Sequence, residues 1–381
     1  MKARHRQHFL LDRSLGHLNH GSYGATPLPV LRQQWQWQRQ METRPVEFHV
    51  RRQEEHLRQA RQQVCHYLGA EVDNTAFVVN TTTAMNWVAH SLVLGPGDEV
   101  LLNDHEYGAV FRCWNVLAKE RGFRVVSATI PLGADALACL QAAATANTRV
   151  VVMSHITSAT AQLFPVQQVG AWARSRGIWS VIDGAHAPGH IPLHLESLGV
   201  DFYMGNLHKW LWAPKGSAVL WVSPRCQSLI RPLVVSWGVD PVHPIAEPAW
   251  VAWVQLQATR DPSAFLAGPA GVDYQRRYHE KLIESHCCRR LEQISESLAQ
   301  MGAVPLPWSR PLKMRAFHWP FPQDPGQLHR RLFEKHRLEV PVYSWNDQLI
   351  VRICLQHYVC DSELERLLEG LSESRVLTSA L

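Results

Sequence analysis

Residues 179–186 read WSVIDGAH, and residues 203–210 read YMGNLHKW. Each stretch opens with an apolar run typical of a buried β-strand and closes with polar residues, Asp183 in the first and Lys209 in the second. Their spacing of about one βα unit predicts two strands of one parallel sheet. Because the carboxyl ends of parallel strands meet at one edge, we expect the carboxylate and the amine at the same rim. Only seven of the 38 basic residues are lysines, so Lys209 is more than a default surface charge.

The chain around these two stretches continues the alternation. Runs of helical character at 84–94, 110–121 and 166–176 separate the strand-like runs. This pattern predicts an α/β fold, a mostly parallel seven-stranded sheet with helices on both faces. The last strand follows its predecessor so closely that we expect it to pair antiparallel. The seven predicted strands are 76–79, 99–103, 124–127, 149–154, 179–183, 202–205 and 218–222.

The flanking segments predict how the domains divide. Residues 48–68 combine charge with helical spacing, which predicts an exposed helix with a solvated polar face. Residues 232–271 are rich in Pro, Gly and Trp and are expected to be an irregular connection and active-site wall. The later pattern predicts a smaller α+β domain, with helices at 274–301, 327–336 and 361–371 and strands at 314–318, 340–343 and 349–355. The predicted parts are an N-terminal segment contributing to the active site (1–40), a large domain (41–270) and a small C-terminal domain (271–381).

Composition restricts the class of protein. A chain of 381 residues with 46% hydrophobic and 19% charged content is typical of a globular protein of two packed domains. The net charge of +5 comes from basic residues scattered among acids, so a nucleic-acid partner is not expected. No stretch has the ~18 apolar residues needed to span a bilayer, so no membrane partner is expected. Eight dispersed cysteines without a CxxC pair predict free thiols in the cytoplasm.

The paired lysine and carboxylate indicate a cofactor. Pyridoxal phosphate (PLP) needs a lysine for a Schiff base and an acid at its pyridine nitrogen. The apolar residues 210–212 would disfavour the protonated form of Lys209, which suits a nucleophile or base. Tyr107, beyond the second strand, can stack on a cofactor ring or belong to the core. Simpler roles also fit: Asp183 as a helix cap, and Lys209 as a surface charge or structural ion pair.

Residues 80–83, NTTT, follow the first strand and begin a helix. A helix start attracts phosphate through its free N–H groups and its dipole, and Thr hydroxyls add donors, although a plain capped helix explains the same residues. The glycine patterns of dinucleotide and P-loop sites are missing from the sequence. His186, His190 and His194 recur every four residues as metal ligands on a helix would. The prolines between them interrupt a helix, so no metal site is expected.

These pieces, in this order, resemble the class V aminotransferase group of fold-type I PLP enzymes, most closely its isopenicillin N epimerase-like branch. The likeness runs from about residue 16 to 370, and the pairing of DGAH with HKWL is specific in combination. The matching stretches are LNHGSYGA (18–25), NTTTA (80–84), HEYGA (105–109), IDGAHAPG (182–189), HKWL (208–211), APKG (213–216) and TRDPS (259–263).

The resemblance implies a set of cofactor-binding residues. Lys209 would form the internal aldimine, Asp183 would pair with the pyridine nitrogen, and Tyr107 would stack on the ring. The full implied set is Thr81, Thr82, Tyr107, Ser158, Asp183, His186, Asn206, His208, Lys209 and Thr259.

Further contacts follow from the same resemblance. Thr81 and Thr82, joined by His208, would hold the phosphate. His186 would lie near the phenolic oxygen or the ring, and Ser158 stands where related enzymes often carry Asn. Thr259 looks like the residue that this group lends to the neighbouring subunit's phosphate, which implies a homodimer with active sites at the subunit interface.

The implied substrate is an amino acid that reacts at its α-carbon. Arg352 is the best candidate for gripping its carboxylate, with Asn19 and His20 as further substrate-binding residues, although a structural role for Arg352 fits as well. Lys209 would remove the Cα proton, and its return to the opposite face would give epimerisation.

Other reactions remain open. Tyr107 would cover the opposite face, where we identify no proton donor, so a cysteine desulfhydrase or C–S lyase is a serious alternative to an epimerase. Aminotransfer is a third, and a catalytically silent binding protein a fourth. Residues 338–345 carry neither the Arg nor the Cys that related cysteine desulfurases have in this region, which disfavours a persulfide relay.

Overall fold

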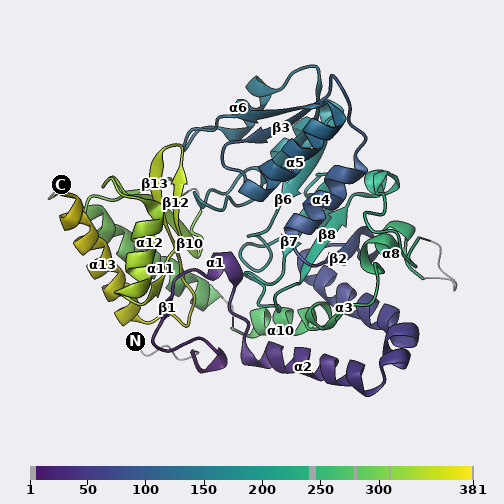
Figure 1. The fold of residues 1–381 in the computed structure, drawn as a ribbon, viewed down its shortest axis with the longest axis horizontal. Helices are drawn as coiled ribbons and strands as arrows, with labels where there is room; N and C mark the ends of the chain where they lie inside the picture. Colours follow the sequence, from purple (N-terminus) through teal and green to yellow (C-terminus); the bar gives the residue numbers. More distant parts are fainter. Residues whose placement is uncertain (1–5, 240–245, 279–280, 309, 380–381) are drawn as a thin grey trace. The chain divides into compact units, whose positions relative to one another are not determined.

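The computed structural model describes residues 6–239, 246–278, 281–308 and 310–379 (Figure 1). The contacts divide the chain into two compact units. The larger unit contains residues 29–157 and 164–273, and the smaller one contains residues 1–28, 158–163 and 274–381. The described helices include none that is both long enough and apolar enough to cross a membrane.

The larger unit is built on a seven-stranded sheet in the order β2-β8-β7-β6-β5-β3-β4. Strand β8 runs antiparallel to both of its neighbours, and the other neighbouring pairs are parallel, as the sequence predicted. Three strands have the bounds that were expected from their apolar runs, and the others differ by one or two residues. The strands are β2 (Thr75–Val78), β3 (Glu99–Asn103), β4 (Arg124–Ala128), β5 (Thr148–Ser154), β6 (Trp179–Asp183), β7 (Phe202–Asn206) and β8 (Ala218–Val222).

Helices α4 (Thr81–Ser91) and α5 (Gly108–Arg121) pack over one face of this sheet (Figure 1). Apolar side chains of both helices form one buried core with β2, β3, β5, β6, β7 and β8. Helix α4 starts where it does because the Asn80 side chain accepts from the Thr83 N–H at 2.8 Å. The remaining helices that begin in or before this unit are α2 (Leu28–Thr43), α3 (Gln53–Leu68), α6 (Ala136–Ala143), α7 (Val166–Ser175), α8 (Ala249–Gln255), α9 (Ser263–Leu266) and α10 (Gly268–Tyr278), with short turns at η2 (Glu47–Arg52), η3 (Val72–Asn74), η4 (Leu195–Ser197) and η5 (Pro224–Leu229).

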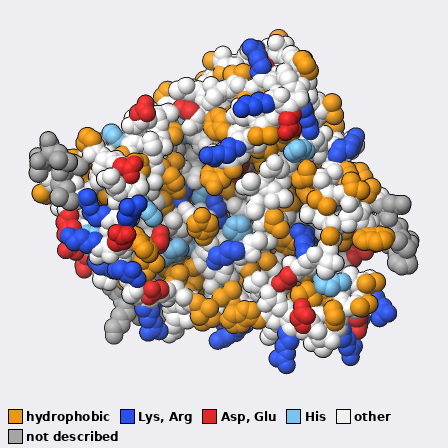
Figure 2. Space-filling model, viewed as in Figure 1, with side chains coloured by type: hydrophobic (Ala, Val, Ile, Leu, Met, Phe, Trp, Pro, Cys, Tyr) orange, Lys and Arg blue, Asp and Glu red, His pale blue; other side chains and the backbone are white. Residues whose placement is uncertain are grey.

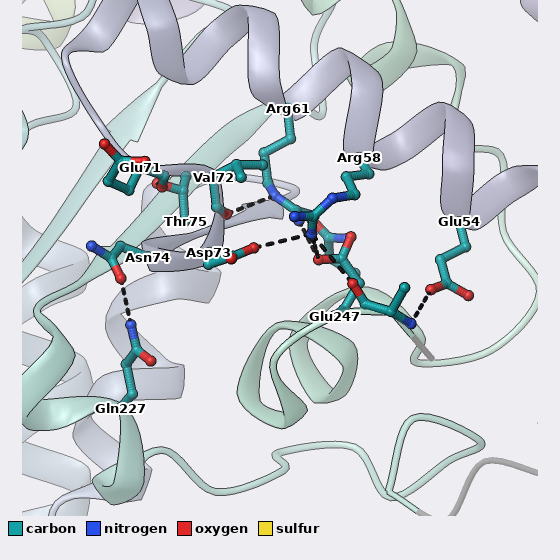
Figure 3. A network of polar contacts seen from close by, with 12 residues as sticks. Glu54, Arg58, Arg61, Glu71, Val72, Asp73, Asn74, Thr75, Gln227 and Glu247 are labelled. Carbon is teal, nitrogen blue, oxygen red and sulfur yellow. Dashed lines mark hydrogen bonds and ion pairs between the residues drawn. The ribbon is translucent and has the colours of Figure 1, made fainter. Parts of the chain in front are cut away.

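The expectation of an exposed helix over 48–68 was wrong for one face of α3. Arg61 is fully buried, and its guanidinium donates to Val72 O at 3.1 Å (Figure 3). The guanidinium also donates to Gln255 Oε1 at 2.9 Å. It also pairs with Glu247 at 2.5 Å, and Arg58 binds the same carboxylate at 2.8 Å. A polar residue at helical spacing can therefore face inward, because partners distant in sequence neutralise and bond it.

The expectation of an irregular connection over 232–271 was also wrong in part, because this segment contains α8, α9 and the start of α10. Pro248 and Pro262 stand at the N-caps of α8 and α9, where a missing N–H removes no helical hydrogen bond. Trp250, Val251 and Val254 of α8 are buried in the core of the sheet. Proline in this segment stands at the starts of helices, whereas the Pro, Gly and Trp content predicted irregular structure.

The smaller unit contains a four-stranded antiparallel sheet in the order β12-β13-β10-β9 and a parallel pair, β1 with β11. The N-terminal residues join this unit, since Leu18 O accepts from Cys354 N at 2.9 Å. The predicted helix 274–301 corresponds to the end of α10 and to α11, and residues 279 and 280 lie outside the described part. Its elements are η1 (Arg6–His8), β1 (Gly16–His17), α1 (His20–Tyr23), α11 (Lys281–Gln300), β9 (Val304–Pro305), β10 (Met314–His318), α12 (Pro325–Glu334), β11 (Leu338–Glu339), β12 (Val342–Trp345), β13 (Gln348–Cys354) and α13 (Asp361–Ser379).

Charged side chains of both signs occur on the surface. Figure 2 shows basic side chains next to acidic ones on the face that it draws, in keeping with the scattered charges of the sequence.

Candidate functional site

The candidate site lies at the carboxyl ends of the parallel strands of the larger unit. Ser154 and Asp183 end β5 and β6 and are register partners, and Met204 of β7 is the next partner of Asp183. Asn206 ends β7, and Lys209 follows it by three residues. The predicted meeting of the carboxylate and the lysine is present, since Asp183 and Lys209 interact electrostatically.

Lys209 is held beside His186, whose tautomer follows from its contacts. The Trp210 indole N–H donates to His186 Nδ1 at 3.2 Å. Since indole nitrogen only donates, Nδ1 must accept, and the neutral imidazole carries its proton on Nε2. That Nε2 lies 3.3 Å from Lys209 Nζ. An N–H facing the amine favours its neutral form, which is the form that attacks an aldehyde, whereas the nearby carboxylate of Asp183 favours the charged form.

The Asp183 carboxylate is buried and has few hydrogen-bond donors around it in the described part of the chain, so its surroundings suit the binding of a cation. Burial raises its pKa, while the Ala185 N–H and the charge of Lys209 act in the opposite direction. Among the described residues, the Ala185 N–H is the donor to this carboxylate, bonding Oδ1 at 2.9 Å. A protonated pyridine nitrogen would supply the missing donor and charge, so these residues fit the ring of PLP.

The first backbone N–H group of α4 is already hydrogen-bonded within the protein. Asn206 Oδ1 accepts from the Thr81 N–H at 3.0 Å, and Asn206 Nδ2 lies 3.4 Å from the Thr81 hydroxyl. Thr82 is exposed in the same turn, and no hydrogen bond joins its N–H or hydroxyl to another described residue. The structure thus joins Asn206 to Thr81 and leaves Thr82 with donors to offer a phosphate.

His208 is neutral in the chain as it stands. Its Nδ1 donates to Ser217 O at 2.9 Å, and burial lowers its pKa to about 4. Nε2 is then an acceptor, so a contact with phosphate requires that His208 take up a proton.

Three other positions were predicted or considered from the sequence. Tyr107 starts α5 with its ring 53% exposed, as a stacking surface requires. Thr259 is exposed in the turn between α8 and α9. The His190 ring stacks on Trp210 with centroids 3.9 Å apart. Over the described ranges, no group of three or more His, Cys, Asp or Glu side chains is arranged to hold a metal ion.

In the smaller unit, Arg352 forms a second polar centre. It is fully buried and donates to Ser158 O at 2.6 Å, Asn19 Oδ1 at 3.1 Å and Ser22 Oγ at 3.0 Å. Its guanidinium also lies 5.3 Å from the centre of the Tyr343 ring. No acidic side chain among the described residues pairs with it, so its charge is balanced only by neutral oxygens.

Three other predicted site residues of this unit, two for the substrate and one for the cofactor, have different environments. Asn19 and Ser158 bind Arg352 directly. His20 is buried elsewhere in the unit, where Nδ1 lies 2.9 Å from the Tyr358 hydroxyl. Ser158 was predicted at the phenolic oxygen of the cofactor, and its bonds to Arg352 are the contacts that the structure shows.

Sequence reasoning missed several buried polar groups near Asp183. Glu106 is bonded to Ser154, and Tyr203 is bonded to His155 with 2.9 Å between the hydroxyl and Nδ1. Glu106 lies in the quoted stretch HEYGA, and an acid just beyond a buried strand could have drawn attention. No local signal separates Ser154, His155 or Tyr203 from ordinary strand residues.

Known proteins resemble this chain over most of its length. The family model described as Aminotransferase class-V matches residues 26–301. Isopenicillin N epimerase of Amycolatopsis lactamdurans is 32% identical over 391 residues, which cover 97% of this chain and 98% of that protein. Putative L-cysteine desulfhydrase 1 of Oryza sativa subsp. japonica is 32% identical over 306 residues, 72% of this chain and 62% of that protein.

A solved structure shows the same fold. A mutant of C-DES with glycine covalently linked to the PLP cofactor superposes with a TM-score of 0.85 at 22% identity, covering 97% of this chain and 99% of that one. The sequence resemblance is thereby confirmed at the level of family and fold. The chain belongs to the class V aminotransferase family of PLP-dependent enzymes.

Proposed function

We propose that this enzyme uses PLP to act at the α-carbon of an amino acid, with epimerisation as its reaction. The observation that carries the proposal is the Lys209 amine, which lies 3.3 Å from His186 Nε2 and interacts electrostatically with the buried carboxylate of Asp183. When bound, PLP supplies an aldehyde for a lysine and an electron sink for a carbanion at Cα.

The chain's own residues have separate tasks around that group. Lys209 carries the cofactor and then takes and returns the Cα proton. Asp183 pairs with the pyridine nitrogen and keeps it protonated. The further proposed cofactor contacts are Thr81, Thr82, Asn206 and His208 for the phosphate end, Tyr107 for the ring face, and His186 and Ser158 for the phenolic oxygen.

Arg352 is proposed to bind the substrate carboxylate. A buried guanidinium without an acidic partner is costly, and a carboxylate that bonds it bidentately offsets that cost. The guanidinium plane is fixed by neutral acceptors on Ser158, Asn19 and Ser22. Because these acceptors carry no charge, the positive charge of Arg352 can pair with a carboxylate of the substrate. His20 stays a proposed substrate contact from the sequence alone.

Epimerisation is preferred because the similarity to isopenicillin N epimerase spans nearly the whole of both chains. C–S lysis, as in a cysteine desulfhydrase, is the second candidate. The similarity to the rice protein favours it, as does the absence of a proton donor identified opposite Lys209. Aminotransfer is a third outcome of the same α-carbon chemistry.

The test begins with the cofactor. Purified enzyme is expected to absorb visible light after addition of PLP, and Lys209→Ala to lose the band that resists dialysis. Lys215→Ala is a matched control, since it removes a nearby lysine on the same segment and should keep that band. A colourless wild-type protein that ignores PLP removes the proposal.

Incubation of candidate amino acids in heavy water then separates the reactions. Deuterium at Cα with loss of optical purity identifies epimerisation. Sulfide with pyruvate identifies C–S lysis, and a stoichiometric keto acid identifies aminotransfer.

We also propose a homodimer in the cytoplasm. Val235 and Trp237, in the segment before α8, are 78% and 70% exposed, and Thr259 is exposed after it. Apolar side chains gathered at the surface suit contact with a second copy. All eight cysteines are free, which suits a reducing compartment. Light scattering is expected to give twice the chain mass, and Trp237→Glu to give the monomer mass.

A further inference from the structure

Glu106 is an acid buried between the ends of two strands, and the proposed mechanism has not used it. Its Oε1 accepts from the Ser154 N–H at 2.7 Å and from Asn103 Nδ2 at 2.6 Å. Its Oε2 lies 2.8 Å from the Ser154 hydroxyl. Asn103 ends β3 and Ser154 ends β5, so this one carboxyl joins the ends of two adjacent strands.

Glu106 also lies beside Asp183. Ser154 and Asp183 are register partners, so their side chains project from the same face of the sheet, about 5 Å apart at Cβ. The carboxyl held by Ser154 therefore neighbours the carboxylate that the proposed function places against the pyridine nitrogen. Each of two neighbouring buried carboxyl groups opposes the ionisation of the other, and the charge of Asp183 raises the pKa of Glu106.

We propose that Glu106 is a positioning residue that works as a neutral carboxylic acid, joining the ends of β3 and β5 and leaving Asp183 as the one negative charge offered to the cofactor. This role at the cofactor rests on the proposed function. A neutral acid can keep all three contacts, because Oε1 accepts both N–H bonds, as a carbonyl oxygen does, and a protonated Oε2 can donate to the Ser154 hydroxyl.

Burial and the charge of the neighbouring carboxylate favour the same protonated form of Glu106. Burial and Asp183 raise its pKa to about 8, against the lowering effect of the hydrogen bonds from the Ser154 N–H, the Ser154 hydroxyl and the Asn103 amide. Lys209 acts on Asp183 and so steadies the charge there. Tyr203 and His155 are further titratable groups near Asp183, and burial favours the neutral form of both by raising the pKa of Tyr203 and lowering that of His155 to about 4.

Glutamine is the deciding substitution. In Glu106→Gln the amide oxygen can accept the two N–H bonds and the amide nitrogen can donate to the Ser154 hydroxyl, so all three contacts survive without a titrating proton. Glu106→Ala removes them. If Glu106 works as an anion, Gln and Ala should instead fail alike.

The first experiment measures urea unfolding of cofactor-free protein from pH 5 to pH 9. Between the ordinary value of 4.5 and about 8, folded Glu106 holds a proton that the unfolded chain has released. The bound proton contributes its whole share of the free energy of unfolding below that window, and this contribution is lost as pH rises through the window. The unfolding constant of wild type should therefore rise relative to Glu106→Gln by up to about tenfold per pH unit in the window.

Glu99, at the other end of β3, is the matched control. Its pKa is lowered by the Thr145 hydroxyl and by Arg124, so its stabilisation is present above the ordinary value and is lost as pH falls. Glu99→Gln should therefore weaken the protein near neutral pH, with the deficit vanishing in acid. The two glutamines are expected to change the pH profile in opposite directions.

The second experiment measures the PLP dissociation constant by visible absorbance. Glu106→Gln should stay within about threefold of wild type and Glu106→Ala should weaken binding about tenfold or more, the scale of a buried hydrogen-bond network. A Gln variant that unfolds, or whose stability keeps a constant offset from wild type across pH, overturns the inference. If the pH series holds but wild type binds no PLP, the neutral acid stands and the proposed function falls.

Discussion

Gly184→Ala provides a sharp test of how the fold holds the site. Gly184 follows Asp183 directly, and a Cβ there would lie 2.3 Å from Cε1, Cζ and Oη of Tyr203. The backbone of Gly184 lies outside the left-handed region, so alanine is conformationally allowed. The whole penalty is therefore steric.

The ring has no easy way to move aside. Tyr203 is fully buried, and its hydroxyl is bonded to His155 Nδ1 at 2.9 Å. Carbon atoms pack best about 3.5–4.0 Å apart, so the ring or the strand must shift by more than 1 Å. Overpacking of this kind costs about 1–3 kcal/mol, and loss of a buried hydrogen bond adds about 1–3 kcal/mol. We expect Gly184→Ala to lower the free energy of unfolding by about 2–6 kcal/mol.

Urea unfolding at pH 7 measures this change, with PLP binding as a second readout because a shift at residue 184 moves Asp183. Gly95→Ala is the control, since a Cβ there meets nothing within 4 Å. The control should stay within about 0.5 kcal/mol of wild type. In a double-mutant cycle, Tyr203→Leu should be less harmful in the Gly184→Ala background than in wild type.

The reasoning fails if Gly184→Ala is as stable as Gly95→Ala. It also fails if the cycle shows no coupling, because the clash would then not involve Tyr203.

Three further substitutions test contacts described above. Trp210→Phe removes the N–H that sets the His186 tautomer, and attachment of PLP in stopped-flow absorbance should slow by about 2–10-fold, whereas an unchanged rate would contradict the tautomer assignment. Arg352→Lys should raise KM for the amino acid by about 10–100-fold with the cofactor absorbance unchanged, and an unaltered KM would remove Arg352 from substrate binding. Glu247→Ala leaves buried Arg61 without its counter-charge and should lower the free energy of unfolding by about 3–5 kcal/mol in urea, so a loss below 1 kcal/mol would contradict the buried pair.

The sequence predicted most of the large sheet because its strands are local apolar runs with polar ends. The run ending at Asp183 was located to the residue, and β8 was expected to be antiparallel from its short connection alone. Arg61 was misjudged because its spacing indicates a surface, while its side-chain partners Gln255 and Glu247 lie 194 and 186 residues away. Hydropathy read along the chain has no access to such pairings.

The site residues could be predicted where the cofactor requires one particular type of side chain, as PLP requires a lysine and an acid. Lys209 and Asp183 are these residues. The neutral state of Glu106 depends on Ser154 and Asp183, which come together only through strand register. The contacts of Ser158 with Arg352 depend on a segment that enters the smaller unit for six residues, 158–163, and no local pattern marks it.

That segment has a consequence for how the protein forms during synthesis. The smaller unit draws on residues 1–28, 158–163 and 274–381, and so it contains both the earliest and the latest parts of the described chain. The ribosome adds Asn19 and Ser158 long before Arg352, whose guanidinium their oxygens accept from. Until residue 352 leaves the ribosome these acceptors have no Arg352, so the nascent chain can complete its large sheet while its proposed substrate clamp is still missing.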